Sequence, residues 1–458
     1  MNKNDRYFGV IPKGASRYSW LTLLNTWLTW ALNGVVFAMV YLIGAPVIEE
    51  FNLSPAIWGW VIFGYLGIRV IVDIPLNMLS DRLGSGWKRK YLWFPIMIQY
   101  SIIGTLIAFP SISDSLWSFI ILLLAVSLGT SASESIGVTA TAEWWAKEER
   151  GFAVGLHHTG YPIGALVGGF FASFILNHFG PESWRLVYFS ALATLPFAIW
   201  YWYLSSSKNA EEVYKNIDKR NLTRPVVLET GHKHSWSDFV SVLKIREVVI
   251  TAVCLFLFQA VYNMFLVTYS QYLIYVKNFA YSEGALLTVV SAITGAFFQF
   301  VVPSISDRIG RKWIIVGIAV WQAAILSLLP IASSFFTIAL VQLLFGFSLF
   351  SAFSTLLATA ADTAPNNKTG AVMGFAFAMT WLGAASGSLL SGYVLELFGG
   401  FHSATAYHII FYIMVALCIF AGVLRMFGRE TIPRKYDANK NETITSTYET
   451  ASTFKVEG

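Results

Sequence analysis

The stretch SDRLGSGWKRK at residues 80–90 has a shorter counterpart, SDRIGRKW, at residues 306–313. Each copy follows one long apolar segment and precedes another, so a short charged turn joins two predicted membrane spans in each half of the chain. The two copies are separated by close to half the length of the chain. A repeat on this scale predicts a duplicated helical bundle, an architecture that is typical of secondary transporters.

The composition independently predicts a membrane protein. Of the 458 residues, 56% are hydrophobic and only 12% are charged, and the mean hydropathy is +0.59. A soluble globule of this size needs more charge to cover its surface. Because a bilayer core requires about 20 apolar residues per helix, we predict an all-α integral membrane fold with twelve transmembrane helices. The predicted spans lie near residues 20–47, 56–79, 91–110, 116–145, 151–179, 184–205, 246–276, 284–304, 313–332, 335–361, 370–398 and 404–427.

The basic residues predict the orientation of these spans. If both termini are cytoplasmic, all but three of the 31 Lys and Arg residues lie on the cytoplasmic side; the exceptions are Arg185, Lys277 and the intramembrane Arg69. This bias is the one expected of a multi-pass protein of the plasma (inner) membrane. The net charge of +5 then indicates contact with anionic lipid headgroups, and no nucleic-acid partner is needed to explain it.

A polar stretch divides the spans into two groups of six. We predict an N-terminal six-helix bundle at residues 1–205, a cytoplasmic linker at 206–244, a C-terminal six-helix bundle at 245–430 and a disordered tail at 431–458. Both cysteines fall inside predicted spans, so the sequence predicts neither a disulfide framework nor a metal site. The sequence contains no phosphate-binding glycine loop and no nucleophile motif in a plausible structural context. We therefore expect the protein to be neither an enzyme nor dependent on a cofactor.

The paired turns DRLG and DRIGRK, after helices 2 and 8 of a six-plus-six arrangement, resemble the loop signature of the major facilitator superfamily. The resemblance covers residues 18–430. It implies two pseudo-symmetric six-helix bundles and a gating role at the cytoplasmic ends for two pairs of residues, Asp81 with Arg82 and Asp307 with Arg308. The alternative is that both turns are simple basic loops that fix the topology.

A narrower resemblance covers helices 2, 4 and 5. The strings GYLGIRVIVDIPLNMLSDRLG, LGTSASESIG and EWWAKEERGFAVGLHHTGYPIGALVGG, followed by SWRLVYF, are similar to the anion:cation symporter branch of that superfamily. Members carry hexuronates, aldonates and other organic anions, commonly with protons. The W-x3-ERG pattern at the helix 4 to helix 5 junction adds Arg150 to the expected gate residues.

The anion-binding arginines of the branch are absent here, and Arg69 is the candidate replacement. Helix 1 offers Asn25 and Asn33 where the branch has an Asp-Arg pair, and Ala125 stands where the branch has a helix 4 Arg. Arg69 could hold a substrate carboxylate, whose planar shape suits a guanidinium group. Alternatively, Arg69 and Asp73 neutralise each other at i, i+4 spacing, because an unpaired charge in mid-membrane is costly.

The expected proton-coupling residues are Glu134 and Asp73. Glu134 lies near the middle of helix 4 among small residues, where a carboxyl group that alternates between wet and dry surroundings can bind and release a proton. The branch resemblance implies the same role, although the acid stands five residues after Gly129 rather than three. The alternatives for Glu134 are a structural salt bridge and simple exposure to the cavity.

Four further residues are expected to contact the substrate: His158, Tyr262, Asn263 and Gln271. Of the neighbours His157 and His158, only one can face a central cavity, because adjacent helical positions diverge by about 100°. The three residues of helix 7 could hydrogen-bond hydroxyl groups of a polyol or sugar acid. Interhelical hydrogen bonding is the alternative for each of them.

Together these features predict a secondary transporter that works by alternating access as a monomer. Its expected activity is proton-coupled import of a small organic anion, such as a sugar acid or another carboxylate. A neutral sugar or polyol carrier, or a drug or metabolite exporter of the same fold, is the alternative. The most remote alternative is a membrane sensor without transport activity.

Overall fold

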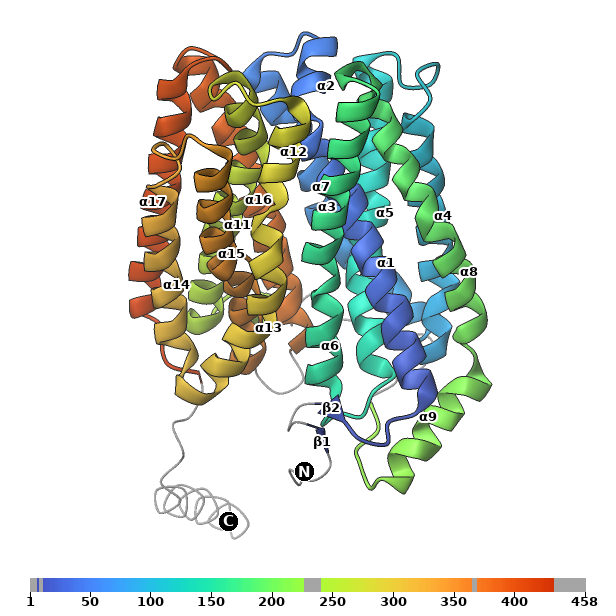
Figure 1. Ribbon diagram of the computed structural model, residues 1–458. Coiled ribbons are helices and arrows are strands. Elements are labelled where there is room, and N and C mark those ends of the chain that lie inside the picture. The colour runs from blue at the N-terminus through green and yellow to red at the C-terminus, as the bar shows by residue number, and fades with distance from the viewer. Residues whose placement is uncertain (1–5, 8–10, 226–239, 365–368, 432–458) are drawn as a thin grey trace.

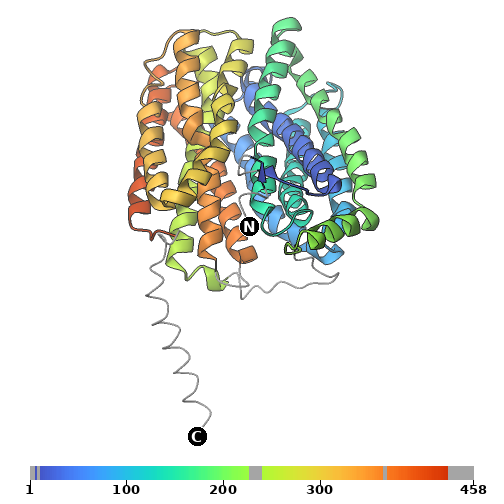
Figure 2. The ribbon, with the colours of Figure 1, turned by 60° about the horizontal axis from the view of Figure 1, so that its bottom comes forward.

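The computed structural model describes residues 6–7, 11–225, 240–364 and 369–431. Two side-by-side groups of helices dominate it, and their long axes run roughly in parallel (Figure 1). A view turned by 60° shows the same two groups next to each other (Figure 2). The predicted tail, apart from its first residue, and the middle of the predicted linker lie outside the described residues. The proposed domain boundaries therefore stay a prediction.

The first group contains α1 to α9, together with two 3-10 helices. Its helices are α1 (Arg17–Leu42), α2 (Gly44–Glu50), α3 (Pro55–Leu83), η2 (Gly86–Arg89), α4 (Lys90–Ile107), α5 (Leu116–Glu143), α6 (Arg150–His158), α7 (Gly160–His178), η3 (Pro181–Ala193), α8 (Thr194–Leu204) and α9 (Ser207–Lys219). An antiparallel pair of two-residue strands, β1 (Arg6–Tyr7) and β2 (Ile11–Pro12), precedes them.

The second group contains α11 to α17. Its helices are α11 (Arg246–Tyr275), α12 (Tyr281–Val289), α13 (Ser291–Ile309), α14 (Arg311–Leu326), α15 (Phe335–Thr363), α16 (Thr369–Leu397) and α17 (Ala404–Met426). Serine side chains cap several helices in both groups: Ser54 accepts a hydrogen bond from the backbone at the start of α3, and Ser334 does so at the start of α15. Such caps satisfy backbone N–H groups that a helix leaves unpaired.

The predicted all-α membrane fold is confirmed. Within the described residues, ten helical segments are long and apolar enough to cross a membrane, with α6–α7, η3–α8 and α12–α13 each forming one segment. The remaining two of the twelve predicted spans are α4 and α14, which have 18 and 16 residues and lie among the others in Figure 1. Both are shorter than predicted.

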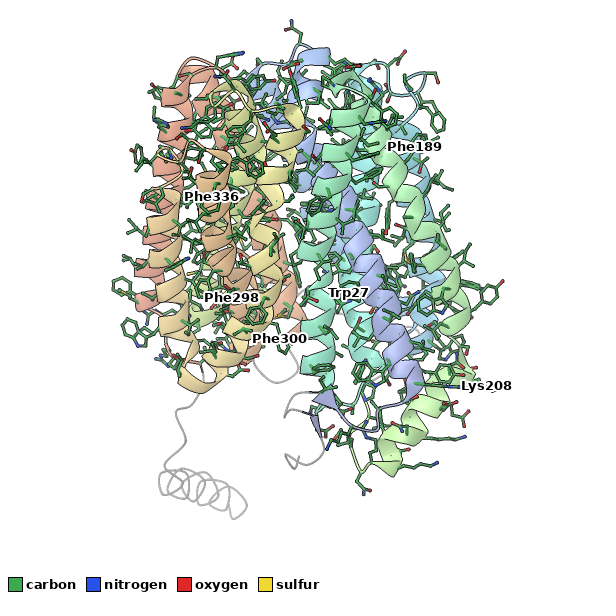
Figure 3. All side chains as sticks on the ribbon, in the orientation of Figure 1. Trp27, Phe189, Lys208, Phe298, Phe300 and Phe336 are labelled. Carbon is green, nitrogen blue, oxygen red and sulfur yellow. The ribbon has the colours of Figure 1, made fainter. Side chains whose placement is uncertain are left out.

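The outer surface of the bundle is apolar, as lipid contact requires. Phe336 and Tyr203 are each 75% exposed, and Phe189 also lies on the outside. Figure 3 shows Phe336 and Phe189 on opposite flanks of the molecule, whereas Lys208 lies at the end where α9 is found. Side chains of this kind on the perimeter indicate that hydrocarbon, not water, surrounds the helices.

The repeated turn has the same backbone conformation in both copies. Gly84 ends α3 with φ 106° and ψ 148°, and Gly310 ends α13 with φ 106° and ψ 142°. Side chains are disfavoured at such positive φ values, which explains the glycine of the DR-x-G pattern. The sequence repeat is therefore also a structural repeat.

The two groups touch along α3 and α16 and along α7 and α12. Gly59 of α3 lies against Gly392 of α16, because a Cβ atom at Gly59 would stand only 3.1 Å from the Gly392 Cα. Near α2, the Tyr275 and Tyr281 hydroxyls donate to Glu49 over 3.0 and 2.6 Å. These contacts join the two groups at the end of the bundle where α2 lies, which we call the α2 end.

Candidate functional site

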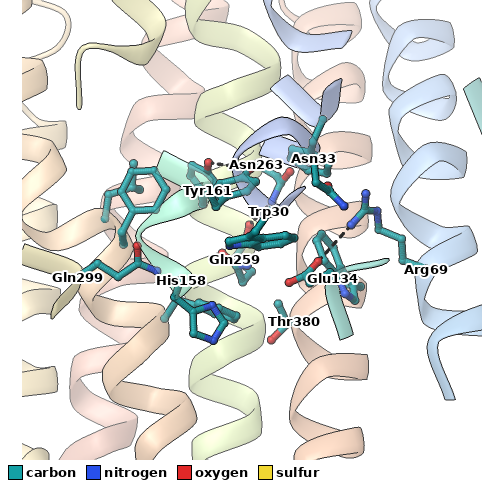
Figure 4. A pocket seen from close by; sticks show the side chains of 16 residues that line it. Trp30, Asn33, Arg69, Glu134, His158, Tyr161, Gln259, Asn263, Gln299 and Thr380 are labelled. Carbon is teal, nitrogen blue, oxygen red and sulfur yellow. Dashed lines mark hydrogen bonds and ion pairs between the residues drawn. The ribbon is translucent and has the colours of Figure 1, made fainter. Parts of the chain in front are cut away.

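A cavity lies between the two groups of helices. Side chains from α1, α3, α5, α6 and α7 line one wall, and side chains from α11, α13, α15 and α16 line the other. The lining residues are Trp30, Asn33, Phe37, Arg69, Glu134, His158 and Tyr161 on the N-terminal wall and Gln259, Tyr262, Asn263, Gln299, Leu349, Phe350, Phe353, Thr380 and Trp381 on the C-terminal wall (Figure 4).

Arg69 reaches the cavity from α3 and is held on all sides, with only 1% of its surface exposed. Its guanidinium group donates to Ser127 over 3.2 Å and to Thr130 over 2.6 Å. These hydroxyls come from the small-residue stretch of α5, which leaves room for the group. The aromatic faces of Trp381 and Phe37 flank the guanidinium carbon at 4.4 and 4.7 Å, an arrangement that stabilises a buried cation.

The ionic partner of Arg69 is Glu134 on the neighbouring helix α5. The Arg69 Nη1 and Glu134 Oε2 atoms lie 3.4 Å apart, and Glu134 is also buried. Among the described residues, no ion pair joins Arg69 to Asp73. Asp73 instead accepts a hydrogen bond from the Ser131 hydroxyl. The structure thus brings all three predicted ionisable residues into one buried region, but it pairs the arginine with the acid of α5.

The adjacent histidines have different surroundings. His158 lines the cavity, whereas His157 is buried, stacks on Trp30 at a centroid distance of 5.9 Å and lies 3.4 Å from the Thr141 hydroxyl. Only one of the two therefore reaches the candidate site, as their helical spacing predicts. In Figure 4, Gln299 lies on the side of the cavity opposite Arg69, and His158 and Glu134 lie between them.

The predicted residues of α11 separate into two places. Tyr262 and Asn263 line the cavity and contact the N-terminal group: the Tyr41 hydroxyl donates to Asn263 over 3.1 Å, and the Tyr161 and Tyr262 hydroxyls lie 3.3 Å apart. Gln271 does not line this cavity. It is buried near Gly44 towards the α2 end, where its Nε2 atom would lie 3.1 Å from a Cβ at Gly44.

Several cavity residues carry no distinctive signal in the sequence. Trp30, Phe37 and Trp381 were not predicted as site residues, because an aromatic residue in an apolar span is expected to pack against other helices. Gln259 and Gln299 belong to a set of membrane glutamines that sequence reasoning could identify as polar and interior. Only the fold separates these two from Gln271.

The expected gate residues lie at the ends of α3 and α13 and at the start of α6. Asp81 pairs with Arg89 over 2.9 Å, and Arg89 also contacts Glu143 over 2.6 Å. Although burial alone would lower it, the hydrogen bonds to Glu143 and the charges of both acids raise the pKa of Arg89. The sequence patterns do not predict Arg89 or Glu143 as gate residues.

The other gate residues are less enclosed. Asp307 pairs with Arg311 over 2.8 Å within the C-terminal group, and Arg82 is exposed. The Arg308 side chain lies outside the described residues. Arg150 begins α6 and is exposed, whereas the preceding Glu149 is buried and pairs with Arg220 after the linker helix α9.

Known proteins provide an independent comparison. The family model described as Major Facilitator Superfamily matches residues 22–287 and 251–456. A hexuronate transporter of Bacillus subtilis is 21% identical over 359 residues, which cover 76% of this chain and 78% of that protein. A niacin transporter of Acinetobacter baylyi is 24% identical over 179 residues, which cover 39% of this chain and 38% of the relative.

A solved structure agrees with this result at the level of the fold. It is that of a bacterial homologue of the human lysosomal transporter Spinster, with a TM-score of 0.67 and 15% identity over 90% of this chain and 97% of the other. The family match extends over both groups of helices and includes the cavity between them. This chain is a membrane transporter, not an enzyme, and it belongs to the Major Facilitator Superfamily.

Proposed function

We propose that this protein imports a small organic anion together with a proton by alternating access. The observation that carries the proposal is the buried ion pair of Arg69 and Glu134 beside the central cavity. The relatives named as niacin and hexuronate transporters support an organic anion as the substrate. In this proposal Arg69 receives the substrate carboxylate, and Glu134 receives the proton.

Charge balance explains why the two ligands would bind together. In the empty carrier the Glu134 carboxylate neutralises Arg69. An anion that takes over Arg69 leaves the Glu134 carboxylate without its ion-pair partner unless Glu134 accepts a proton, and a proton without the anion leaves Arg69 without that partner. An unpaired charge in mid-membrane costs about 2.5 to 3.5 kcal/mol on insertion scales. Singly loaded states are therefore disfavoured roughly 100-fold relative to the empty and doubly loaded states.

Asp73 is the second candidate for proton coupling. It lies one helical turn from Arg69 and accepts a hydrogen bond from Ser131, so its carboxylate has a partner besides the arginine. For this reason we place the coupling proton on Glu134 and assign Asp73 a supporting role in the same proton path. Substitution of each acid by its amide separates the two roles.

The gates and the orientation complete the proposal. Asp81, Arg82, Arg150, Asp307 and Arg308 control closure at the cytoplasmic ends, where the repeated turns lie. The basic residues support a plasma-membrane (inner-membrane) location with both termini in the cytoplasm, and the cavity lies between two halves of a single chain, so the monomer suffices for transport.

Transport into proteoliposomes tests this function. Purified protein is reconstituted with an imposed pH gradient, inside alkaline, and uptake of radiolabelled carboxylates is compared with uptake of neutral sugars. We expect gradient-driven accumulation of at least one carboxylate, loss of uptake in Arg69→Gln, and no change in the matched surface control Arg17→Gln. Accumulation of neutral sugars alone, or anion uptake that ignores the pH gradient, would contradict the proposal.

A further inference from the structure

The cavity is lined to a large extent by aromatic rings. Seven of its sixteen lining residues are aromatic, and both groups of helices contribute: Trp30, Phe37, Tyr161, Tyr262, Phe350, Phe353 and Trp381. Several of them contact each other across the cavity; Phe350, for example, lies edge-on to Tyr161 and Tyr262 at centroid distances of 6.2 and 5.8 Å. Such a lining favours a flat apolar body over a heavily hydroxylated one.

The aromatic rings also surround the site proposed for the carboxylate. Trp381 and Phe37 flank the Arg69 guanidinium at 4.4 and 4.7 Å, and Trp381 belongs to the C-terminal wall whereas Phe37 belongs to the N-terminal wall. A carboxylate that reaches Arg69 brings the atoms attached to it against these rings. An aromatic ring can stack there, but a chain of hydroxyl groups would lose its water without gaining partners.

Most polar groups of the cavity are already paired within the protein. Asn33 donates to the Thr130 carbonyl over 2.8 Å, Asn263 accepts from Tyr41, and the Tyr161 and Tyr262 hydroxyls contact each other. A sugar acid carries four or more hydroxyl groups that need partners, and each buried group left unpaired costs about 1 to 3 kcal/mol. The cavity therefore selects against such a substrate.

One buried hydrogen-bond acceptor of the cavity lacks a partner within the described residues, and the Trp30 indole N–H is a buried donor in the same situation. The Gln299 side chain is only 6% exposed, and its Oε1 atom is buried without a hydrogen-bond partner within the part of the chain that the structure describes. Figure 4 shows Gln299 on the side of the cavity opposite Arg69. An unpaired buried amide is costly, so a ligand that donates a hydrogen bond at this side would be favoured.

We infer that the transported anion is a planar aromatic monocarboxylate with a hydroxyl or N–H group remote from its carboxylate. This inference rests on the proposed function. The carboxylate binds Arg69, the ring lies among Phe37, Trp381 and the other cavity aromatics, and the remote group donates to Gln299. Sugar acids, which the sequence also allows, are excluded by the same geometry.

Ligand pairs that differ in one property test this inference on the unmodified protein. We propose to measure binding of 4-hydroxybenzoate, benzoate, trans-4-hydroxycyclohexanecarboxylate and glucuronate to the purified carrier by calorimetry, and their uptake into proteoliposomes. The expected order is 4-hydroxybenzoate first, with at least about tenfold weaker binding of the non-planar ring because stacking contacts with the cavity aromatics are lost. Glucuronate should not bind measurably.

A variant then assigns the remote contact. Gln299→Leu should remove the preference for 4-hydroxybenzoate over benzoate while leaving benzoate binding unchanged, and Gln322→Leu, at a buried glutamine of α14 outside the cavity, is the matched control. If glucuronate or the cyclohexane acid binds as well as 4-hydroxybenzoate and is accumulated with protons, the aromatic inference is wrong and the proposed function stands. If none of the four acids is bound or accumulated, the aromatic inference is wrong, and the proposed function is wrong as well if the wider carboxylate screen in proteoliposomes also shows no uptake.

Discussion

The two walls of the central cavity differ in charge. The N-terminal wall contributes Arg69 and Glu134, whereas the C-terminal wall contributes amide, hydroxyl and aromatic side chains such as Gln299, Tyr262 and Trp381. Their contacts with a ligand differ accordingly: an ion pair supplies a large, distance-sensitive attraction, and neutral contacts supply shape and hydrogen bonding. We interpret the first wall as the place of coupling and the second as the place of selection.

The largest expected effect is on the charged wall. Arg69→Gln and Arg69→Lys should each reduce anion uptake by about 100-fold or more, because Gln removes the cation and Lys cannot form the same forked contact. Protein yield and elution on size exclusion should match the wild type and the Arg17→Gln control. Uptake within a fewfold of the wild type would show that the anion does not depend on Arg69.

Glu134 allows binding to be separated from coupling. Glu134→Gln should abolish accumulation driven by the pH gradient, since the amide cannot exchange a proton, and should retain anion counterflow between equal pH values. Asp73→Asn is the comparison variant: a supporting role in the proton path predicts slower uptake that still accumulates the anion under the pH gradient. Loss of coupling in Asp73→Asn but not in Glu134→Gln would reverse the two assignments.

His158 lies on the same wall but is expected to be a contact, not a proton carrier. His158→Asn should raise the KM for uptake by about threefold to tenfold, in keeping with the loss of one hydrogen bond. The dependence of the initial rate on external pH should keep its shape. A flattened pH profile in this variant would assign a titrating role to the histidine.

On the neutral wall the expected effects are smaller. Tyr262→Phe removes the hydroxyl that meets Tyr161, and interhelical hydrogen bonds in membranes contribute about 0.6 kcal/mol on average. The apparent affinity should therefore fall about threefold at most, with the proton-to-anion ratio unchanged, as measured by paired proton and anion fluxes. A changed ratio would remove the functional distinction between the walls.

Gln271→Ala should have the smallest effect on affinity, because Gln271 lies near Gly44 and outside the cavity. The Kd for the anion, measured by calorimetry, should remain within the error of the wild-type value. A large loss of affinity would place Gln271 at the substrate.

Much of the fold follows from local patterns in the sequence. The repeated DR-x-G turn predicts two related bundles, and its glycines adopt the same positive φ at Gly84 and Gly310. Long apolar runs predict the helices, and the small residues of α5 predict a place where polar groups can approach. These features depend on neighbours in the chain, so one sequence suffices to find them.

The details of the site depend on neighbours in space. The i, i+4 spacing on α3 allows an ion pair between Arg69 and Asp73. The Arg69 side chain instead contacts α5, where two hydroxyl groups and Glu134 accept hydrogen bonds from its guanidinium N–H groups. Gln271 stands eight residues beyond Asn263 on α11, which rotates it by about 80° and moves it by about 12 Å along the helix. Helical phase alone did not reveal which of the membrane glutamines reach the cavity.

Proton uptake on anion binding tests the central claim most directly. Purified carrier in weakly buffered detergent solution is mixed with 4-hydroxybenzoate, or with another carboxylate shown to bind, and the pH change is recorded in wild type, Asp73→Asn and Glu134→Gln. If the anion displaces Glu134 from Arg69, about one proton should be taken up per anion by the wild type and Asp73→Asn. Glu134→Gln should bind the anion without taking up a proton. Binding without proton uptake in the wild type, or the same uptake in Glu134→Gln, would contradict the account.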